Sequence, residues 1–235
     1  MMTYMAKKKK VAIFDIDGTI FRSSLLIEVT EALIQEGLFP VKAKDVYAAS
    51  YQNWLNRKDS YQNYIGDVVK AFEKNIKGIA RQDFIRISKN VVDFHKSRVY
   101  RHTRDLVKDL KKKNYFLLAI SHSPKELVDP FCKNWGFDKV YGRVYEVNKA
   151  GKFTGATLYA ELINDKAKIL ERAVEKENLT LVGSVGVGDT ESDIAFLKLV
   201  KNPICFNPNK ALYQHAKAKK WHIVVERKDM VYKLN

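Results

Sequence analysis

The sequence predicts a three-layer α/β fold, in which a parallel sheet lies between helices and a helical segment is inserted after the first strand. Short apolar runs such as Val11–Phe14 and Tyr115–Ile120 alternate with amphipathic stretches, which is typical of parallel strands joined by helices. The runs end in glycine turns or polar clusters, as strands buried on both faces do. Between Ser24 and His95, by contrast, apolar residues recur only at helical spacing.

The inserted segment is expected to be all-helical. Apolar residues between Leu25 and Ile34 recur every three or four positions, and Gly37 with Pro40 then ends the first helix. We predict a core formed by residues 1–22 and 97–235, interrupted by a helical insertion formed by residues 23–96. The further helices of the insertion are expected at Ala43–Asn56, Ser60–Asn75 and Arg81–Lys96.

Strands and helices alternate through the rest of the chain, which predicts helices on both faces of the sheet. A hairpin is expected where Lys149 and Gly151 form a turn between two short strands. The expected helices are Thr103–Lys113, Lys125–Trp135, Asn164–Asn178, Ile194–Lys201 and Lys210–Lys219. The expected strands are Tyr115–Ile120, Lys139–Tyr141, Arg143–Val147, Lys152–Thr157, Val182–Val187, Pro203–Phe206 and His222–Val225.

Polar side chains follow three of the predicted parallel strands, at the point where each strand ends. In an open α/β sheet, ligands bind outside the carboxyl ends of the strands, so side chains that are distant in sequence should converge there. The three clusters are Asp15, Asp17 and Thr19 after the first strand, Ser121 and Ser123 after the second, and Asp189 and Asp193 after the third.

These side chains supply the parts that phosphoryl transfer requires: a nucleophile in line, a cation, and donors for the phosphoryl oxygens. Asp15 is the expected nucleophile, and Asp17 the group that protonates the leaving oxygen and later activates water. Asp15 and Asp189 are expected to hold Mg²⁺, which prefers oxygen ligands. Ser121 would donate to the phosphoryl group, and Lys166 would offset the clustered negative charge.

The four motifs together resemble the haloacid dehalogenase-like hydrolase superfamily, within its phosphoserine-phosphatase-like branch. The motifs are Asp15-Ile-Asp-Gly-Thr19, Ser121-His-Ser-Pro124, Lys166, and Gly188-Asp-Thr-Glu-Ser-Asp193, and their order and separation span nearly the whole chain. The resemblance implies a Rossmann-like core, an aspartyl-phosphate intermediate, and a mobile cap formed by the helical insertion.

The same resemblance implies a role for each matching residue. Asp15 matches the nucleophile, Asp17 the acid/base that also ligates Mg²⁺ through its backbone carbonyl, and Asp189 a further Mg²⁺ ligand. Asp193 is expected to support the metal's waters or the lysine, and Lys166 to steady nucleophile and phosphate. The candidate phosphate-binding residues are Thr19, Ser121 and His122, although His122 could instead cap its loop.

Three functions remain open from the sequence. The first is a phosphatase for a small phosphorylated metabolite, and the second is phosphoserine phosphatase itself. Ser24 occupies the position of the cap glutamate that holds the ammonium of phosphoserine, which favours the first over the second. The third is a basic nucleic-acid-binding protein with an idle hydrolase core. The retained carboxylates argue against that function, because a binding protein has no need to hold them against mutual repulsion.

The chain is strongly basic, with 42 Lys and Arg, 27 Asp and Glu, and a net charge of +15. Such a charge attracts anions in general, including nucleic acid. The lysines are nevertheless dispersed and not interleaved with aromatic residues, which argues against a nucleic-acid partner and predicts a solvated basic surface. The oligomeric state stays open.

Composition indicates a cytoplasmic protein. The two cysteines, Cys132 and Cys205, lie far apart and predict neither a disulfide framework nor a zinc site. No apolar run approaches the roughly 18 residues of a membrane span. Val11–Phe14 is too short to be the apolar part of a signal peptide.

Overall fold

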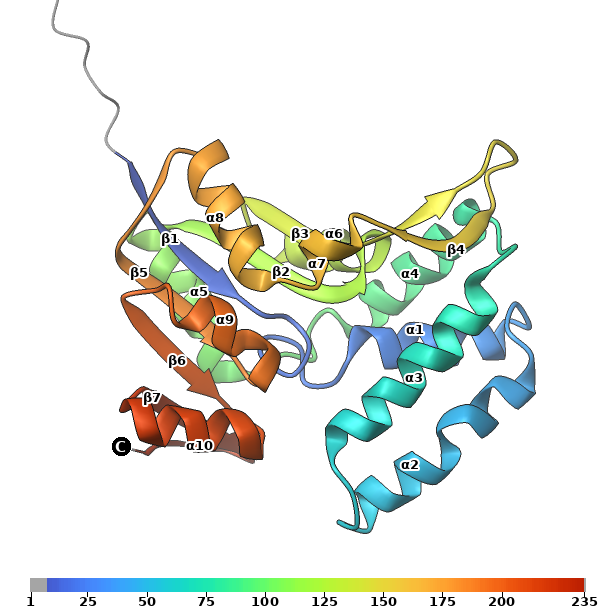
Figure 1. Ribbon diagram of the computed structural model, residues 1–235, viewed down its shortest axis with the longest axis horizontal. Helices are drawn as coiled ribbons and strands as arrows, with labels where there is room; N and C mark the ends of the chain where they lie inside the picture. Colours follow the sequence, from blue (N-terminus) through green and yellow to red (C-terminus); the bar gives the residue numbers. More distant parts are fainter. Residues whose placement is uncertain (1–7, 235) are drawn as a thin grey trace, which may run out of the picture.

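The computed structural model describes residues 8–234, so the first seven residues of the predicted core, including Lys7 of its lysine run, lie outside the described part. An eight-stranded sheet runs through the molecule in the order β4-β3-β2-β1-β5-β6-β7-β8 (Figure 1). The six central strands are parallel, and β4 and β8 add antiparallel edges. The strands are β1 Lys9–Phe14, β2 Phe116–Pro124, β3 Lys139–Val147, β4 Phe153–Leu158, β5 Leu179–Gly188, β6 Asn202–Phe206, β7 His222–Arg227 and β8 Met230–Leu234.

Strand β1 lies at the centre of the sheet and is buried on both faces. Ala12 and Phe14 belong to one apolar core, whereas Val11 and Ile13 belong to a second core on the opposite face. Successive side chains of a strand point to opposite faces, so a continuous apolar run can fill two cores at once. The run that follows the basic N-terminal residues therefore forms a central strand rather than an edge.

Helices cover both faces of the sheet, which confirms the predicted three-layer α/β fold. Helices α5 (Arg101–Lys112) and α6 (Lys125–Asn134) contribute to the first core. The second core is covered by α7 (Ala160–Ile163), α8 (Lys166–Lys176), α9 (Ile194–Leu197) and α10 (Lys210–Lys219). A short 3-10 turn, η2 (Glu191–Asp193), precedes α9.

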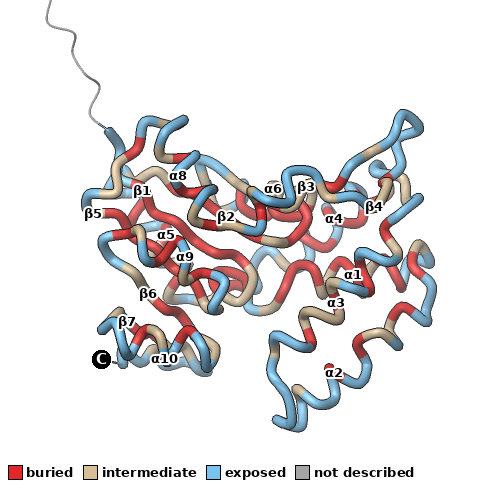
Figure 2. Tube along the Cα trace, viewed as in Figure 1, coloured by how far each residue is buried: buried red, intermediate tan, exposed pale blue. Residues whose placement is uncertain are grey.

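Residues 25–95 contain only helices and their connections. Two chain segments join them to the sheet side by side, through an antiparallel bridge between Phe21 and Val99. Buried residues of the helices are continuous with the first core, while α2 is largely exposed (Figure 2). The elements are α1 (Leu25–Gln35), the 3-10 turn η1 (Val41–Lys44), α2 (Asp45–Leu55), α3 (Tyr61–Ile76) and α4 (Arg81–His95).

The structure differs from the expected elements in three places. The two short strands expected on either side of Gly142 form one strand, β3. This glycine does not end the strand; it lets the start of α6 lie close to the strand backbone. A Cβ at Gly142 would lie 2.8 Å from Cα of Lys125, at the start of α6. Helix α7 and strand β8 were not expected; β8 is mostly exposed, so it lacks the apolar alternation that marks a strand.

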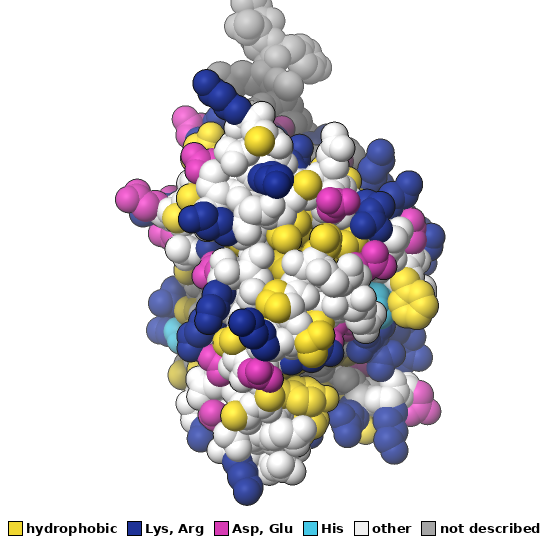
Figure 3. Space-filling view, turned by 90° about the vertical axis from the view of Figure 1, so that its right-hand side faces the viewer, with side chains coloured by type: hydrophobic (Ala, Val, Ile, Leu, Met, Phe, Trp, Pro, Cys, Tyr) yellow, Lys and Arg dark blue, Asp and Glu magenta, His cyan; other side chains and the backbone are white. Residues whose placement is uncertain are grey.

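Lys and Arg side chains are scattered over the face shown in Figure 3, with acidic and neutral side chains between them. That face therefore presents no continuous basic surface. Several exposed cations are paired with carboxylates, as Arg98 is with Glu28 at 2.8 Å. None of the helices within residues 8–234 has the length and apolar character that crossing a bilayer requires.

Candidate active site

The loop after β1 carries two carboxylates at the carboxyl edge of the sheet. The backbone N–H of Asp15 still donates to the Val187 carbonyl of β5, at 2.9 Å, which holds the first carboxylate at the strand end. Gly18 then turns the chain with φ of +82°. A Cβ at this glycine would lie 2.2 Å from Oδ2 of Asp189, so only glycine lets the two loops approach this closely.

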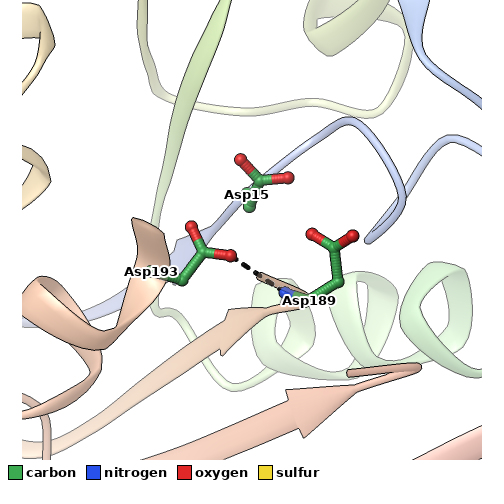
Figure 4. A group of neighbouring side chains, drawn as sticks. All are labelled: Asp15, Asp189 and Asp193. Carbon is green, nitrogen blue, oxygen red and sulfur yellow. Dashed lines mark hydrogen bonds between the residues drawn. The ribbon is translucent and has the colours of Figure 1, made fainter. Parts of the chain in front are cut away.

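Three carboxylates converge where β1 and β5 end. Oxygen atoms of Asp15, Asp189 and Asp193 lie within 4.8 Å of one another, and Figure 4 shows their side chains gathered around one space. Oδ2 of Asp193 accepts hydrogen bonds from the backbone N–H groups of Asp189 and Thr190, at 2.9 and 3.0 Å. This capping arrangement fixes the loop that carries Asp189.

Lys166 enters the cluster from the first turn of α8. Its buried Nζ donates to Oδ1 of Asp15 at 2.6 Å and to Oδ1 of Asp193 at 2.5 Å. Burial opposes the charge of the ammonium, but the two carboxylates outweigh burial and raise the pKa of Lys166 above its ordinary value. The helix begins here because the Asp165 side chain accepts from the N–H groups of Ala167 and Lys168.

Negative charge exceeds positive charge in this cluster, which fits a divalent cation. Burial raises the pKa of Asp15 to about 8, with Lys166 opposing the shift and Asp193 and Asp17 adding to it. Burial and then Asp15 raise the pKa of Asp189 well above its ordinary value. Oδ2 of Asp15 and Oδ2 of Asp189 accept no hydrogen bond from any residue between 8 and 234. The free oxygen of Asp189 is a suitable ligand for a hard cation such as Mg²⁺, and the free oxygen of Asp15 faces the cavity.

Asp17 is held by three donors. Its Oδ1 accepts from the backbone N–H of Leu25 at 2.5 Å, and its Oδ2 accepts from Ser121 Oγ at 2.7 Å and Ser123 Oγ at 2.9 Å. Burial raises the pKa of Asp17, and the donors oppose that shift. Ser121, a predicted phosphate ligand, is thus fully buried against Asp17, while Ser123 lies at the cavity wall.

The two other predicted phosphate-binding residues also have partners within the protein. The Thr19 hydroxyl donates to Oδ1 of Asp189 at 3.1 Å, and Thr19 does not line the cavity. His122 lines the cavity, and its Nε2 donates to the Ile163 carbonyl at 3.1 Å. Burial, followed by the nearby charges of Lys166 and Arg143, lowers the pKa of His122 to about 4, so the ring is neutral at pH 7.

A cavity of about 240 Å³ lies between these groups and the helical segment. Asp15, Asp17, Asp189 and Lys166 all line it. The motif analysis missed several other lining residues. Tyr61 is one of several aromatic residues in the insertion, which a sequence pattern cannot tell apart from residues that pack helices together. A single basic residue in a hairpin, such as Arg143, gives no signal for a site. The lining residues outside the motifs are Ser24, Leu26, Tyr61, Gln62, Ile65, Gly66, Val69, Arg143 and Tyr145.

Comparison with known proteins gives one family and several full-length relatives. Residues 12–198 match the model of the family described as haloacid dehalogenase-like hydrolase. The chain is 24% identical over 224 residues to a histidinol-phosphatase from Neisseria meningitidis, covering 92% of this chain and 98% of that protein. It is 25% identical over 233 residues to a phosphoserine phosphatase from Methanocaldococcus jannaschii, covering 96% of each.

Solved structures share the fold. A protein of unknown function from Bordetella pertussis superposes with a TM-score of 0.73 at 15% identity, covering 92% of this chain and 98% of the other. A phosphoserine phosphatase solved as an analogue of its phospho-aspartyl intermediate superposes with a TM-score of 0.61 at 23% identity, covering 95% and 96%. Both likenesses extend across the sheet and the helical segment alike.

Proposed function

Because this chain belongs to the haloacid dehalogenase-like hydrolases, we propose that it is a Mg²⁺-dependent phosphatase that hydrolyses a small phosphorylated metabolite through an aspartyl-phosphate on Asp15. Its relatives of nearly equal length include phosphatases for histidinol phosphate and phosphoserine. It falls in the phosphoserine-phosphatase-like branch of the family. The substrates of these two relatives have the phosphoryl group in common and differ in the leaving group.

The observation that carries the proposal is the way in which Lys166 holds Asp15. The lysine occupies Oδ1 of the carboxylate, and Oδ2 is left without a protein donor at the wall of the cavity. A carboxylate that is fixed through one oxygen presents the other in a single direction, which is what attack on phosphorus requires. The ammonium also favours the ionised form of Asp15, against the burial that raises its pKa.

In the first step, Oδ2 of Asp15 attacks phosphorus as the bond between phosphorus and the leaving oxygen breaks. Asp17 donates its proton to that oxygen, and the alcohol departs. Asp17 is suited to this role because burial raises the pKa of its carboxyl, so that it retains a proton at a higher pH than a free aspartate does. The hydrogen bonds from Leu25, Ser121 and Ser123 fix its orientation.

In the second step, Asp17 is ionised and takes a proton from water as that water attacks phosphorus. The bond between phosphorus and Asp15 breaks, and inorganic phosphate leaves. Asp17 regains the proton that it gave up, so acid and base are the same residue in successive steps. Asp193 holds Lys166 and the Asp189 loop throughout, and acts through them rather than on the substrate.

Asp15 and Asp189 would hold Mg²⁺ through their side chains, with Asp17 contributing its backbone carbonyl. A bound divalent cation supplies positive charge for the phosphoryl oxygens. We further propose that residues 23–96 act as a cap over the core formed by residues 1–22 and 97–235. Side chains of α1 and α3 form one wall of the cavity, so movement of these helices would open and close it.

The test is turnover of p-nitrophenyl phosphate with and without Mg²⁺. Asp15→Asn is expected to lower kcat by at least ~10³-fold, as removal of a nucleophile does. Asp109→Asn, on the exposed face of α5, is the matched control and should retain activity. Asp17→Asn protein quenched in acid should retain covalent phosphate, whereas Asp15→Asn protein should retain none. Comparable turnover by Asp15→Asn and wild type would dismiss this nucleophile.

A further inference from the structure

Arg143 is a largely buried cation at the cavity wall that catalysis does not use. It lies on β3, and its side chain is 15% exposed. Its Nη2 donates to Oδ1 of Asn164 at 3.1 Å, and its Nη1 lies 3.8 Å from Oε1 of Glu73, too far for a hydrogen bond. A guanidinium has five N–H donors. Only one of them is bonded within residues 8–234.

Among the described residues that line the cavity, Arg143 is the one cation that remains available to a ligand. Lys166 is committed to Asp15 and Asp193 at 2.6 and 2.5 Å, and the neutral ring of His122 adds no charge. A buried guanidinium whose donors are mostly unused is a binding site for a planar anion, because its fork matches the two oxygens of a carboxylate.

The cavity wall offers no carboxylate that could pair with a cationic group of the substrate. Its acidic residues are Asp15, Asp17 and Asp189, which belong to the proposed catalytic cluster. Ser24 faces the cavity without charge. Glu28, one helical turn later, does not line the cavity and instead contacts His95 at 3.2 Å and Arg98 at 2.8 Å. Glu73, the other nearby carboxylate, does not line the cavity and already faces Arg143 at 3.8 Å. An ammonium on the substrate would therefore be buried beside a like charge, with no carboxylate of the cavity wall to pair with.

We propose that Arg143 is the specificity-determining residue, and that the preferred substrate is a small phosphomonoester whose leaving group carries a carboxylate and no ammonium. The inference rests on the proposed phosphatase function, because it places the phosphoryl group at Asp15. A carboxylate is favoured over a larger anion, since a cavity of about 240 Å³ must also hold the phosphoryl group. The preference excludes phosphoserine and histidinol phosphate, which carry amines.

The experiment compares three two-carbon phosphomonoesters that differ in charge at one end: phosphoglycolate, 2-hydroxyethyl phosphate and phosphoethanolamine. The expected order of kcat/KM is phosphoglycolate, then 2-hydroxyethyl phosphate, then phosphoethanolamine. A hydrogen-bonded charge pair predicts a preference of roughly 10- to 100-fold for the first over the second. Arg143→Gln should reduce that ratio at least ~10-fold, and Arg143→Lys should retain part of it because the charge remains.

Arg172→Gln on the exposed face of α8 is the matched control, and it should leave the ratio as in wild type. Circular dichroism checks that each variant is folded. Hydrolysis of all three esters without preference for phosphoglycolate, or a ratio that Arg143→Gln does not change, would overturn the inference while leaving the phosphatase function standing.

Calorimetric binding to the Asp15→Asn protein separates the two proposals further. Tighter binding of phosphoglycolate than of 2-hydroxyethyl phosphate, lost on adding Arg143→Gln, supports the anion site even if no ester is hydrolysed. Equal binding of the two esters overturns it. If the wild type hydrolyses neither these esters nor p-nitrophenyl phosphate, the proposed phosphatase function is dismissed instead.

Discussion

Replacing Lys166 by Met tests the central electrostatic feature of this molecule. The lysine is buried and makes two short hydrogen bonds to Asp15 and Asp193. Methionine keeps most of the side-chain volume but removes the ammonium, so the change isolates charge from packing. The remaining carboxylates then lie together in the interior without a compensating cation.

The expected loss of unfolding free energy depends on pH. Removing one partner of a buried ion pair costs about 3–5 kcal/mol when the other stays charged. The pKa of folded Asp15 is about 8 against an ordinary 3.8, and loss of Lys166 raises it further. A raised folded pKa means that the folded state holds its proton more tightly, so stability falls as pH rises from about 4 through about 8. Below about pH 8 a proton neutralises Asp15 in both proteins, and the cost of the substitution should be about 1–3 kcal/mol. Above pH 8 the wild type ionises Asp15 beside Lys166, whereas the variant keeps its proton, so the cost should rise toward about 3–5 kcal/mol.

The assay is urea unfolding of wild type and Lys166→Met at pH 6 and pH 9.5, in buffer with a chelator. Lys168→Met is the control, because this neighbouring lysine is 65% exposed and lies 3.7 Å from Asp165. It should change stability by less than about 1 kcal/mol. If Lys166→Met lowers the free energy of unfolding equally at the two pH values, Asp15 is not the carboxylate whose charge Lys166 compensates.

Three more outcomes follow from the same contacts. Mg²⁺ should raise Tm more at pH 8 than at pH 5, since the carboxyls must lose their protons to bind it, and Asp189→Asn should remove most of that increase in differential scanning fluorimetry. Gly18→Ala should cost about 1–3 kcal/mol of stability in urea and lower p-nitrophenyl phosphate turnover, because its Cβ would lie 2.2 Å from Asp189. Ser121→Ala removes a donor that lowers the pKa of Asp17, so the limb of the pH–rate profile that reports this acid should move to higher pH; an unmoved limb would argue against Asp17 as the acid.

The sequence predicts the arrangement of the core well, because each parallel strand carries a strong local signal. Val11–Phe14 is apolar throughout, and it fills both cores as β1. The meeting of Asp15 with Asp189 could also be anticipated, since both follow strands that end at the same edge of a parallel sheet. Strand β8 gave no such signal, because antiparallel pairing with β7 holds it although its side chains face solvent.

The sequence could not predict which groups the polar side chains would contact. Ser121 and Thr19 are predicted to bind phosphate, and the motifs alone did not indicate that their hydroxyls donate to Asp17 and Asp189. A hydroxyl at a strand end can turn toward either partner at similar cost, and the choice depends on loop positions that no residue pattern encodes. Arg143 was missed for a related reason, because a basic residue in a hairpin is usually exposed, and its contacts with Glu73 and Asn164 come from segments that are distant in the sequence.

Burial of the carboxylate cluster lowers the stability of the folded protein, and the same burial makes the cluster suitable for binding a cation. Asp15 follows directly after a strand whose side chains are buried on both faces, so the loop cannot move the carboxylate toward solvent without disturbing two cores. Gly18 and Gly188 bring Asp189 and Asp193 closer than any other residue would allow. Burial and like charge together raise the pKa of Asp15 and Asp189, and the same two terms strengthen the attraction for a divalent ion or a phosphoryl centre. The clustered carboxylates at the end of β1 therefore lower the stability of the unliganded protein, and a bound cation or substrate would raise that stability again.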